Sequence, residues 1–243
     1  ASQYDEICGQ DAFLNVYHDM FRSMFVPSPQ LQSVLDQVRF TGTGTAQGVD
    51  ADADADADED HEQKNAHILS PGTYSVAHYR AEYGKEVDRH PMLTSPEFIQ
   101  KVAINSLRCA IQLQPNDPIY FASDNMMALQ FVRKYASQIQ YPIYTFDRQE
   151  TIVLRLDEYN ITITSDETDP SEYYSTFVDL YLAGNGRCVT FGRGGFGRYA
   201  NLLSTNSSCA VSHVRNFYPV GCVGHGPLHK DKDLLRLEGF KNP

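Results

Sequence analysis

The sequence lacks any long hydrophobic run, any excess of positive charge and any C-x-x-C pair of cysteines. None of its apolar stretches reaches the ~18 to 20 residues needed to cross a bilayer, so we expect no membrane segment in this chain. It carries 20 Lys and Arg residues against 31 Asp and Glu residues. A protein that binds nucleic acid through a general basic surface is therefore disfavoured.

The negative charge is concentrated in one tract. Eight of the acidic residues lie between Asp50 and Glu62, where there is no Lys or Arg, so the rest of the chain is nearly neutral. Residues 41–69 are of low complexity, with alternating Asp and Ala and no apolar periodicity, which predicts a disordered acidic loop. Weak calcium binding by these aspartates is the alternative, but the tract lacks a calcium-binding turn closed by Glu.

Few features of the sequence bear on its compartment. The five cysteines have no zinc-site spacing, so we expect no zinc, and they are too few for a disulfide-stapled miniprotein. The chain starts at Ala1 without a leader, so we expect that a leader was removed or that the chain is part of a longer protein. N-glycosylation sequons at Asn160 and Asn206 permit a secretory compartment, but chance alone gives about one or two such sequons.

Helical and strand-like patterns divide the chain into regions. We expect a helical segment over 1–40, a domain over 70–218 and a C-terminal tail over 219–243. The strands expected in the domain cover 73–80, 118–122, 141–146, 187–191 and 210–214, and its helices begin near Pro96, after a Ser123-Asp124 cap, near Ser171 and near Arg198. Alternating strands and helices form a parallel sheet covered on both faces. The predicted fold is therefore α/β, a Rossmann-like parallel sheet with flanking helices.

Polar residues at the strand ends are the candidate ligand contacts, because ligands of such sheets bind beyond the carboxyl ends of the strands. His78 and Arg80 end the first strand and share one of its faces, since alternate residues do. An arginine fork beside a histidine suits a diphosphate, although a surface Arg and a core His are the alternative. Ser123 and Asp124 end the second strand, and Asp147 follows the third.

A glycine-rich segment over 192–197, GRGGFG, stands between the fourth strand and the helix after it. It matches the G-x-G-x-x-G pattern of dinucleotide sites, but an acidic residue should then close the next strand, which ends with Ser212-His213 instead. We therefore expect no NAD or FAD. Gly192, Gly194 and Gly195 are predicted to offer backbone amides of a helix N-terminus to phosphate oxygens, with a tight turn that needs glycine as the alternative.

Several of these segments are similar, in their order, to one known family. His78-Tyr79-Arg80 is followed by NSLRC at 105–109, by PIYFASDN at 118–125, by FVDLYL at 177–182 and by CVTF at 188–191. This order resembles the donor-binding half of GT-B fucosyltransferases, the superfamily of the α-1,6-fucosyltransferases, NodZ and the protein O-fucosyltransferases. The resemblance covers roughly residues 70 to 215.

The resemblance implies transfer of fucose from GDP-fucose to a glycan or glycoprotein acceptor with inversion, and no cofactor or metal. It implies that Arg80 binds the β-phosphate and neutralises the leaving GDP, supported by His78. It implies that Asp179 lies against the guanine or ribose with Asp124 near the same pocket, and that Asp88 is the general base. The family also implies the C-terminal half of a GT-B fold and the lumen of the Golgi or endoplasmic reticulum.

Two alternatives remain open from the residues themselves. Glu82 and Glu86 compete with Asp88 as the base, because all three lie in the loop that follows Arg80. The chain is alternatively a non-catalytic Rossmann-like module that binds a nucleotide or a protein partner through the same strand ends.

Overall fold

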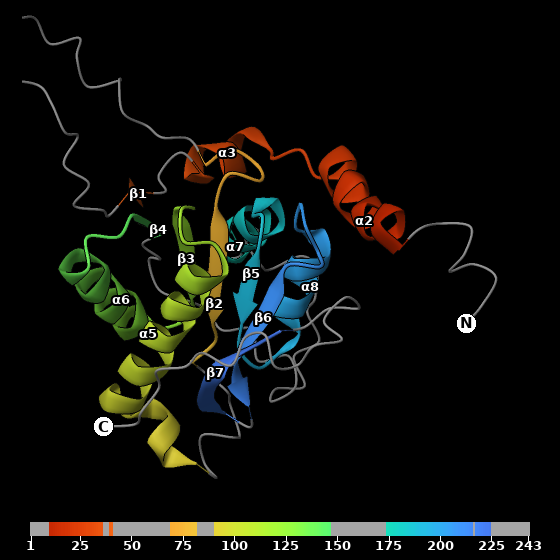
Figure 1. The fold of residues 1–243 in the computed structure, drawn as a ribbon. Helices are drawn as coiled ribbons and strands as arrows, with labels where there is room; N and C mark the ends of the chain where they lie inside the picture. The colour runs from red at the N-terminus through yellow and green to blue at the C-terminus, as the bar shows by residue number, and fades with distance from the viewer. Residues whose placement is uncertain are drawn as a thin grey trace, which may run out of the picture.

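The computed structural model describes residues 10–35, 39–40, 69–81, 90–146, 174–215 and 217–224 (Figure 1). The predicted acidic loop, apart from Leu69, lies outside these residues. Asp88 and Asp147 lie outside them as well, so the roles predicted for them stay predictions.

A seven-stranded sheet forms the centre of the protein, in the order β1-β4-β3-β2-β5-β6-β7. The strands are β1 (Arg39–Phe40), β2 (Ser75–Tyr79), β3 (Ile119–Ser123), β4 (Ile143–Thr145), β5 (Val189–Phe191), β6 (Ala210–Arg215) and β7 (Tyr218–Gly224). Strands β4, β3, β2, β5 and β6 are parallel, whereas β1 and β7 pair antiparallel at the two edges. The predicted α/β class with a mostly parallel sheet is thereby confirmed.

Helices cover both faces of this sheet (Figure 1). On one face lie α5 (Pro96–Leu113) and α6 (Met126–Gln138), whose buried residues pack with Ala77 of β2 and Phe121 of β3. On the other lie α7 (Tyr174–Asn185) and α8 (Gly195–Leu203), which pack with Val76, Tyr120 and Val189. Because neighbouring residues of a strand point to opposite faces, each buried strand supplies both cores.

The N-terminal helical segment packs onto the second of these helical layers. It consists of α2 (Gln10–Met24) and α3 (Pro29–Leu35), which contact α8 and α7 respectively. The break predicted at Pro27 and Pro29 separates the two helices. In α2, His18 Nδ1 lies 2.6 Å from the carbonyl oxygen of Leu203, which ties α2 to the end of α8.

Local sequence signals explain the start of α5, whereas the structure corrects the predicted cap of α6. Ser95 accepts a hydrogen bond from the amide of Phe98, and Pro96 occupies the first turn, as predicted. The cap of α6 is Asn125, which accepts from two backbone amides of the first turn, so the predicted Ser123-Asp124 cap is wrong. Ser123 still belongs to β3 and is buried there.

Two boundaries at the C-terminal side also differ from the prediction. Helix α8 begins at Gly195, three residues before the predicted start at Arg198. Strand β7 was not predicted, and the expected tail over 219–243 begins inside it. In the turn before β7, Phe217 adopts a φ of 70°, a left-handed conformation that usually favours Gly or Asn. Because Phe stands there instead, the sequence carries no signal for this turn.

Two disulfides join elements of the sheet and its helices. Cys109 of α5 is bonded to Cys222 of β7, and Cys188 before β5 is bonded to Cys209 before β6.

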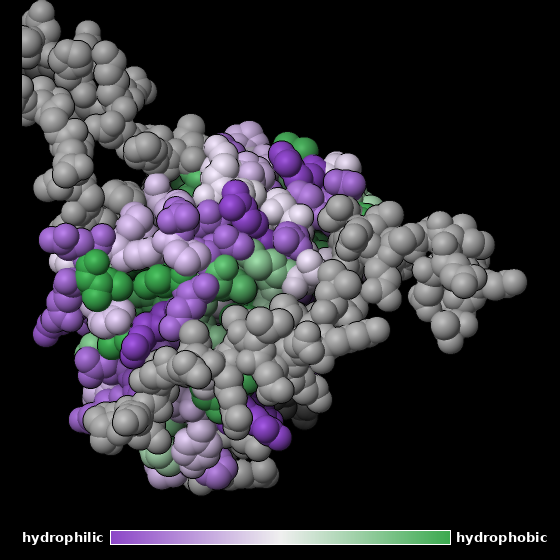
Figure 2. Space-filling model, in the orientation of Figure 1, coloured by the Kyte–Doolittle hydropathy of each residue, from purple (hydrophilic) through white to green (hydrophobic). Residues whose placement is uncertain are grey.

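In Figure 2 a narrow hydrophobic band crosses the visible face near α5 and α6, with hydrophilic residues on both sides. Within the described ranges, no helix combines the length and apolar character that crossing a membrane requires.

Candidate functional site

The order of the parallel strands reverses between β2 and β5. From β2 the chain builds outward through β3 and β4, and then places β5 and β6 on the other side of β2. In open α/β sheets, ligands bind beyond the carboxyl ends of the strands at this reversal. We call residues 78–80, at the end of β2, and residues 192–197, which directly follow β5, the switch-point site.

Arg80 lies beside the glycine turn of the switch-point site. A Cβ built on Gly194 would lie 3.7 Å from Cδ and 3.8 Å from Nη1 of Arg80. Arg80 directly follows β2 and Gly194 lies in the turn after β5, so the pairing of these two strands brings the residues together. The Arg80 side chain is half-buried. A guanidinium fork, which presents paired donors suited to phosphate oxygens, therefore lies at the mouth of the turn.

The first turn of α8 adds a second source of positive potential. Gly194 is its N-cap, with a φ of 112° that residues other than glycine rarely adopt. Among the residues that the structure describes, a Cβ built on Gly195 would meet no atom within 4 Å. The amides at a helix N-terminus carry partial positive charge and attract anions. Arg80 and the start of α8 therefore offer positive charge beside open space.

His78 packs beneath α8. Its side chain is 8% exposed, and its ring stacks on that of Phe196 with 4.8 Å between the centroids. Gly197 passes so close that a Cβ there would lie 3.2 Å from Nδ1 of His78. His78 and Arg80 thus share the α8 face of β2, as the alternation of strand residues predicts. The histidine supports the first turn of α8.

Asp124 connects the ends of β2 and β3. Its Oδ1 accepts a hydrogen bond of 2.7 Å from the amide of Ala81, the residue after Arg80. Ser123 is buried, and its hydroxyl accepts a bond of 3.3 Å from the amide of Asn125. Both predicted nucleotide contacts therefore make backbone hydrogen bonds at the strand ends, and Asp124 holds the backbone that presents Arg80.

The structure does not bring Asp179 to the switch-point site. Its carboxylate is 2% exposed and accepts a hydrogen bond of 2.5 Å from the hydroxyl of Tyr120. Tyr120 is the second residue of β3, near its amino end, whereas Arg80 lies at the carboxyl ends of the strands. A buried carboxylate needs a donor, and Tyr120 supplies one inside the core. A contact between Asp179 and guanine or ribose stays a prediction.

Sequence reasoning missed His213 of β6 as part of this site. Its Nε2 lies 3.0 Å from the carbonyl oxygen of His78, and a Cβ built on Gly192 would lie 3.3 Å from the same nitrogen. Complete burial lowers the pKa of His213 to about 4. A histidine within the apolar run of β6 was the available signal, but nothing in the run indicates its partner. His213 holds the end of β2 from the side opposite Asp124.

The rim of the site carries a second arginine. The guanidinium carbon of Arg193 lies 3.9 Å from the centroid of the Phe217 ring, a cation–π contact. His90 approaches the same ring, with 6.0 Å between the centroids. The unusual turn at Phe217 thus positions an aromatic platform for a cation of the glycine segment.

Outside the switch-point site, two further features of the described ranges bear on ligand binding, namely groups of metal ligands and hollows. There, no three residues among His, Cys, Asp and Glu are grouped so as to hold a metal ion. A small apolar hollow of about 40 Å³ lies among α2, α3 and α7, lined by residues such as Phe21, Leu31 and Tyr181. It shares no residue with the switch-point site.

Comparison with known proteins leaves the chemistry of the site as the basis for assigning a function. No protein-family model matches the chain, and neither the curated proteins nor the solved structures contain a match.

Proposed function

We propose that the switch-point site binds the diphosphate of a nucleotide sugar, and that the chain is the donor-binding part of a fucosyltransferase-type glycosyltransferase that uses GDP-fucose. The observation that carries the proposal is the position of Arg80 beside Gly194, where the strand order reverses and α8 begins. A fork of donors and a helix N-terminus favour one class of ligand, an anion with several oxygens. In this proposal the domain is the C-terminal half of a GT-B fold.

The proposed reaction is a single displacement at C1 of the sugar. The bond between C1 and the diphosphate oxygen breaks as the acceptor oxygen bonds to C1 from the opposite face, which inverts its configuration. Arg80 neutralises the charge that develops on the leaving GDP, the largest electrostatic task in such a reaction. Asp88 takes the proton of the acceptor hydroxyl as general base.

Two side chains, the half-buried Asp124 and the buried His213, support this role of Arg80 by holding the end of β2. Asp124 binds the amide of Ala81 on one side, and His213 binds the carbonyl oxygen of His78 on the other. The backbone on both sides of Arg80 is therefore held before a ligand arrives. Such preorganisation lowers the cost of ordering the site on binding.

We also propose an oxidising compartment, the lumen of the Golgi or endoplasmic reticulum. The support is the pair of disulfides, Cys109–Cys222 and Cys188–Cys209. Disulfides persist in secreted proteins and in the endoplasmic reticulum and are rare in a reducing cytosol.

Titration calorimetry with GDP, GDP-fucose and NAD tests the site. We expect binding of GDP and GDP-fucose but not of NAD, and about 10- to 100-fold weaker GDP binding in Arg80→Ala, because a hydrogen bond to a charged group contributes about 1.5–3 kcal/mol. Gly195→Leu should block GDP binding by filling the open space at the start of α8. Gly221→Leu is the matched control, because a Cβ at Gly221 also meets no atom of the described residues within 4 Å.

The outcomes separate the proposal from its alternative. Release of GDP from GDP-fucose in the presence of glycan acceptors, lost in Asp88→Asn, supports the transferase. GDP binding without turnover favours a non-catalytic nucleotide-binding module. A folded sample that binds no GDP overturns both nucleotide readings.

A further inference from the structure

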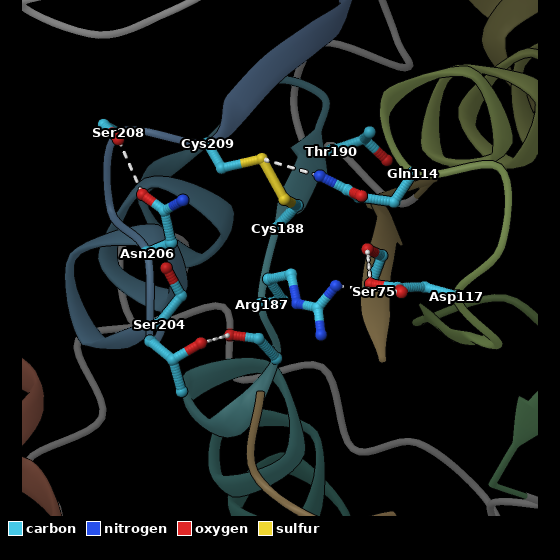
Figure 3. The surroundings of a disulfide bond; sticks show 12 residues. Ser75, Gln114, Asp117, Arg187, Cys188, Thr190, Ser204, Asn206, Ser208 and Cys209 are labelled. Atoms are coloured by element: carbon cyan, nitrogen blue, oxygen red, sulfur yellow. Dashed lines mark hydrogen bonds and ion pairs between the residues drawn. A yellow bond between two sulfur atoms is a disulfide. The ribbon is translucent and has the colours of Figure 1, made fainter. Parts of the chain in front are cut away.

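The turn between α8 and β6 contains an asparagine, and both ends of the turn are fixed to the rest of the domain. At its start, the amide of Thr205 donates to the carbonyl oxygen of Gly186 at 3.0 Å, and the Thr205 hydroxyl donates to the same oxygen at 3.3 Å. At its end, Cys209 is bonded to Cys188 (Figure 3). Asn206 lies between these anchors and is exposed. The turn therefore presents Asn206 to solvent in a defined position.

Asn206, Ser207 and Ser208 form an N-glycosylation sequon, and the structure pairs its two defining side chains. The hydroxyl of Ser208 donates a hydrogen bond of 2.6 Å to Oδ1 of Asn206 (Figure 3). Ser207, the middle residue, is buried, and its carbonyl oxygen accepts a bond of 2.9 Å from Asn201. The middle residue thus faces the protein, while the amide and the hydroxyl lie together at the surface.

The position of Asn206 is compatible with the proposed nucleotide site. The turn immediately precedes β6 and therefore lies at the amino ends of the parallel strands. The switch-point site lies at their carboxyl ends, on the opposite edge of the sheet. A bulky, hydrated group on Asn206 would extend away from Arg80 and leave the ligand edge open.

We propose that Asn206 carries an N-linked glycan. In the modification, Nδ2 of Asn206 bonds to C1 of the first sugar of a lipid diphosphate-linked oligosaccharide. The bond between C1 and the diphosphate oxygen breaks, the lipid diphosphate leaves, and the amide nitrogen loses one proton. The proposal rests on passage through the lumen inferred from the two disulfides, and not on nucleotide binding at the switch-point site.

The full chain, directed into the endoplasmic reticulum of a eukaryotic cell, provides the test. Peptide N-glycosidase treatment in heavy-oxygen water converts each glycan-bearing Asn to an isotope-labelled Asp, which mass spectrometry then assigns to a position. We expect label at residue 206 in the wild-type chain and in Ser208→Thr, which keeps the hydroxyl. We expect none there in Ser208→Ala or Asn206→Gln.

An unlabelled Asn206 in the disulfide-bonded wild-type protein overturns the proposal, whether or not Asn160, the other sequon, is labelled. The wild-type measurement needs no variant, so a variant that fails to fold does not weaken it. GDP titration of Asn206→Gln keeps the two proposals apart. We expect unchanged GDP affinity in this variant, because the turn lies at the other edge of the sheet.

Discussion

Nε2 of His213 lies 3.0 Å from the backbone carbonyl oxygen of His78. Because a carbonyl oxygen only accepts hydrogen bonds, Nε2 carries the proton, and the neutral ring is the Nε2–H tautomer. His213 is fully buried, and this burial lowers its pKa from 6.5 to about 4, although the bond to His78 opposes the shift. The strand that presents Arg80 is thus held by a histidine that folds in its neutral form.

This histidine should make the stability of the protein depend on pH. Between pH 6.5 and about 4 the unfolded chain binds a proton that the folded His213 does not. The contribution of neutral His213 to the free energy of unfolding is therefore fully present above pH 6.5 and is lost as the pH falls. The free energy of unfolding should fall with a slope approaching about 1.4 kcal/mol per pH unit. Urea unfolding at a series of pH values measures the slope. In His213→Gln, which retains an N–H donor without titrating, the slope should be smaller; equal slopes in the two proteins would contradict the assignment.

Asp124→Ala should destabilise the protein and weaken GDP binding together. The substitution removes the 2.7 Å acceptor of the Ala81 amide, and an unsatisfied buried donor costs about 1–3 kcal/mol. Asp124→Asn keeps a carbonyl oxygen in the same place, so we expect a smaller loss of both properties. Denaturant unfolding measures the stability of the two variants, and GDP titration measures their affinity for GDP. If Asp124→Ala binds GDP as the wild type does, Asp124 does not position Arg80.

Gly197→Ala should lower the melting temperature by several degrees. The added Cβ would lie 2.4 Å from Cβ of Phe191, which belongs to a buried strand and cannot move away as a flexible side chain would. Overpacking of this kind costs typically about 1–3 kcal/mol. Gly221→Ala is the control, because within the described part of the chain its Cβ meets no atom closer than 4 Å. Calorimetry should show a lower melting temperature for Gly197→Ala but not for Gly221→Ala.

The two disulfides should contribute unequally to stability. Cys109 and Cys222 are separated by 113 residues, and Cys188 and Cys209 by 21. The chain-entropy model gives about 5 kcal/mol for the longer loop and about 3 kcal/mol for the shorter. Urea unfolding of Cys109→Ser and Cys188→Ser should therefore show the larger loss in Cys109→Ser. The reverse order would mean that native-state effects outweigh loop closure.

Much of the sheet was predictable because its signals are local. Buried parallel strands appear as short apolar runs, and the cap of α5 is formed by adjacent residues, Ser95 and Pro96. Strand β7 carries Pro219 and Gly221 and follows a turn at Phe217 without a turn signature, so local reasoning did not find it. Its place in the sheet depends on pairing with β6 and on the bond from Cys222 to Cys109.

The site was predictable only in part, for a similar reason. That His78 and Arg80 share a face follows from strand alternation. That Arg80 meets Gly194 depends on β5 pairing with β2, which brings distant parts of the chain together. Asp179 was assigned from the resemblance of its segment alone, and local sequence does not show that Tyr120 donates to its carboxylate in the core.

The bond between Cys109 and Cys222 also affects how this protein would respond to a protease. Any single cut between residues 110 and 221 leaves one cysteine of the pair on each fragment. The two fragments would then remain covalently joined and migrate as one species on a gel without thiols, and they would separate once reductant is added. A nicked molecule could thus go unnoticed in a non-reduced preparation.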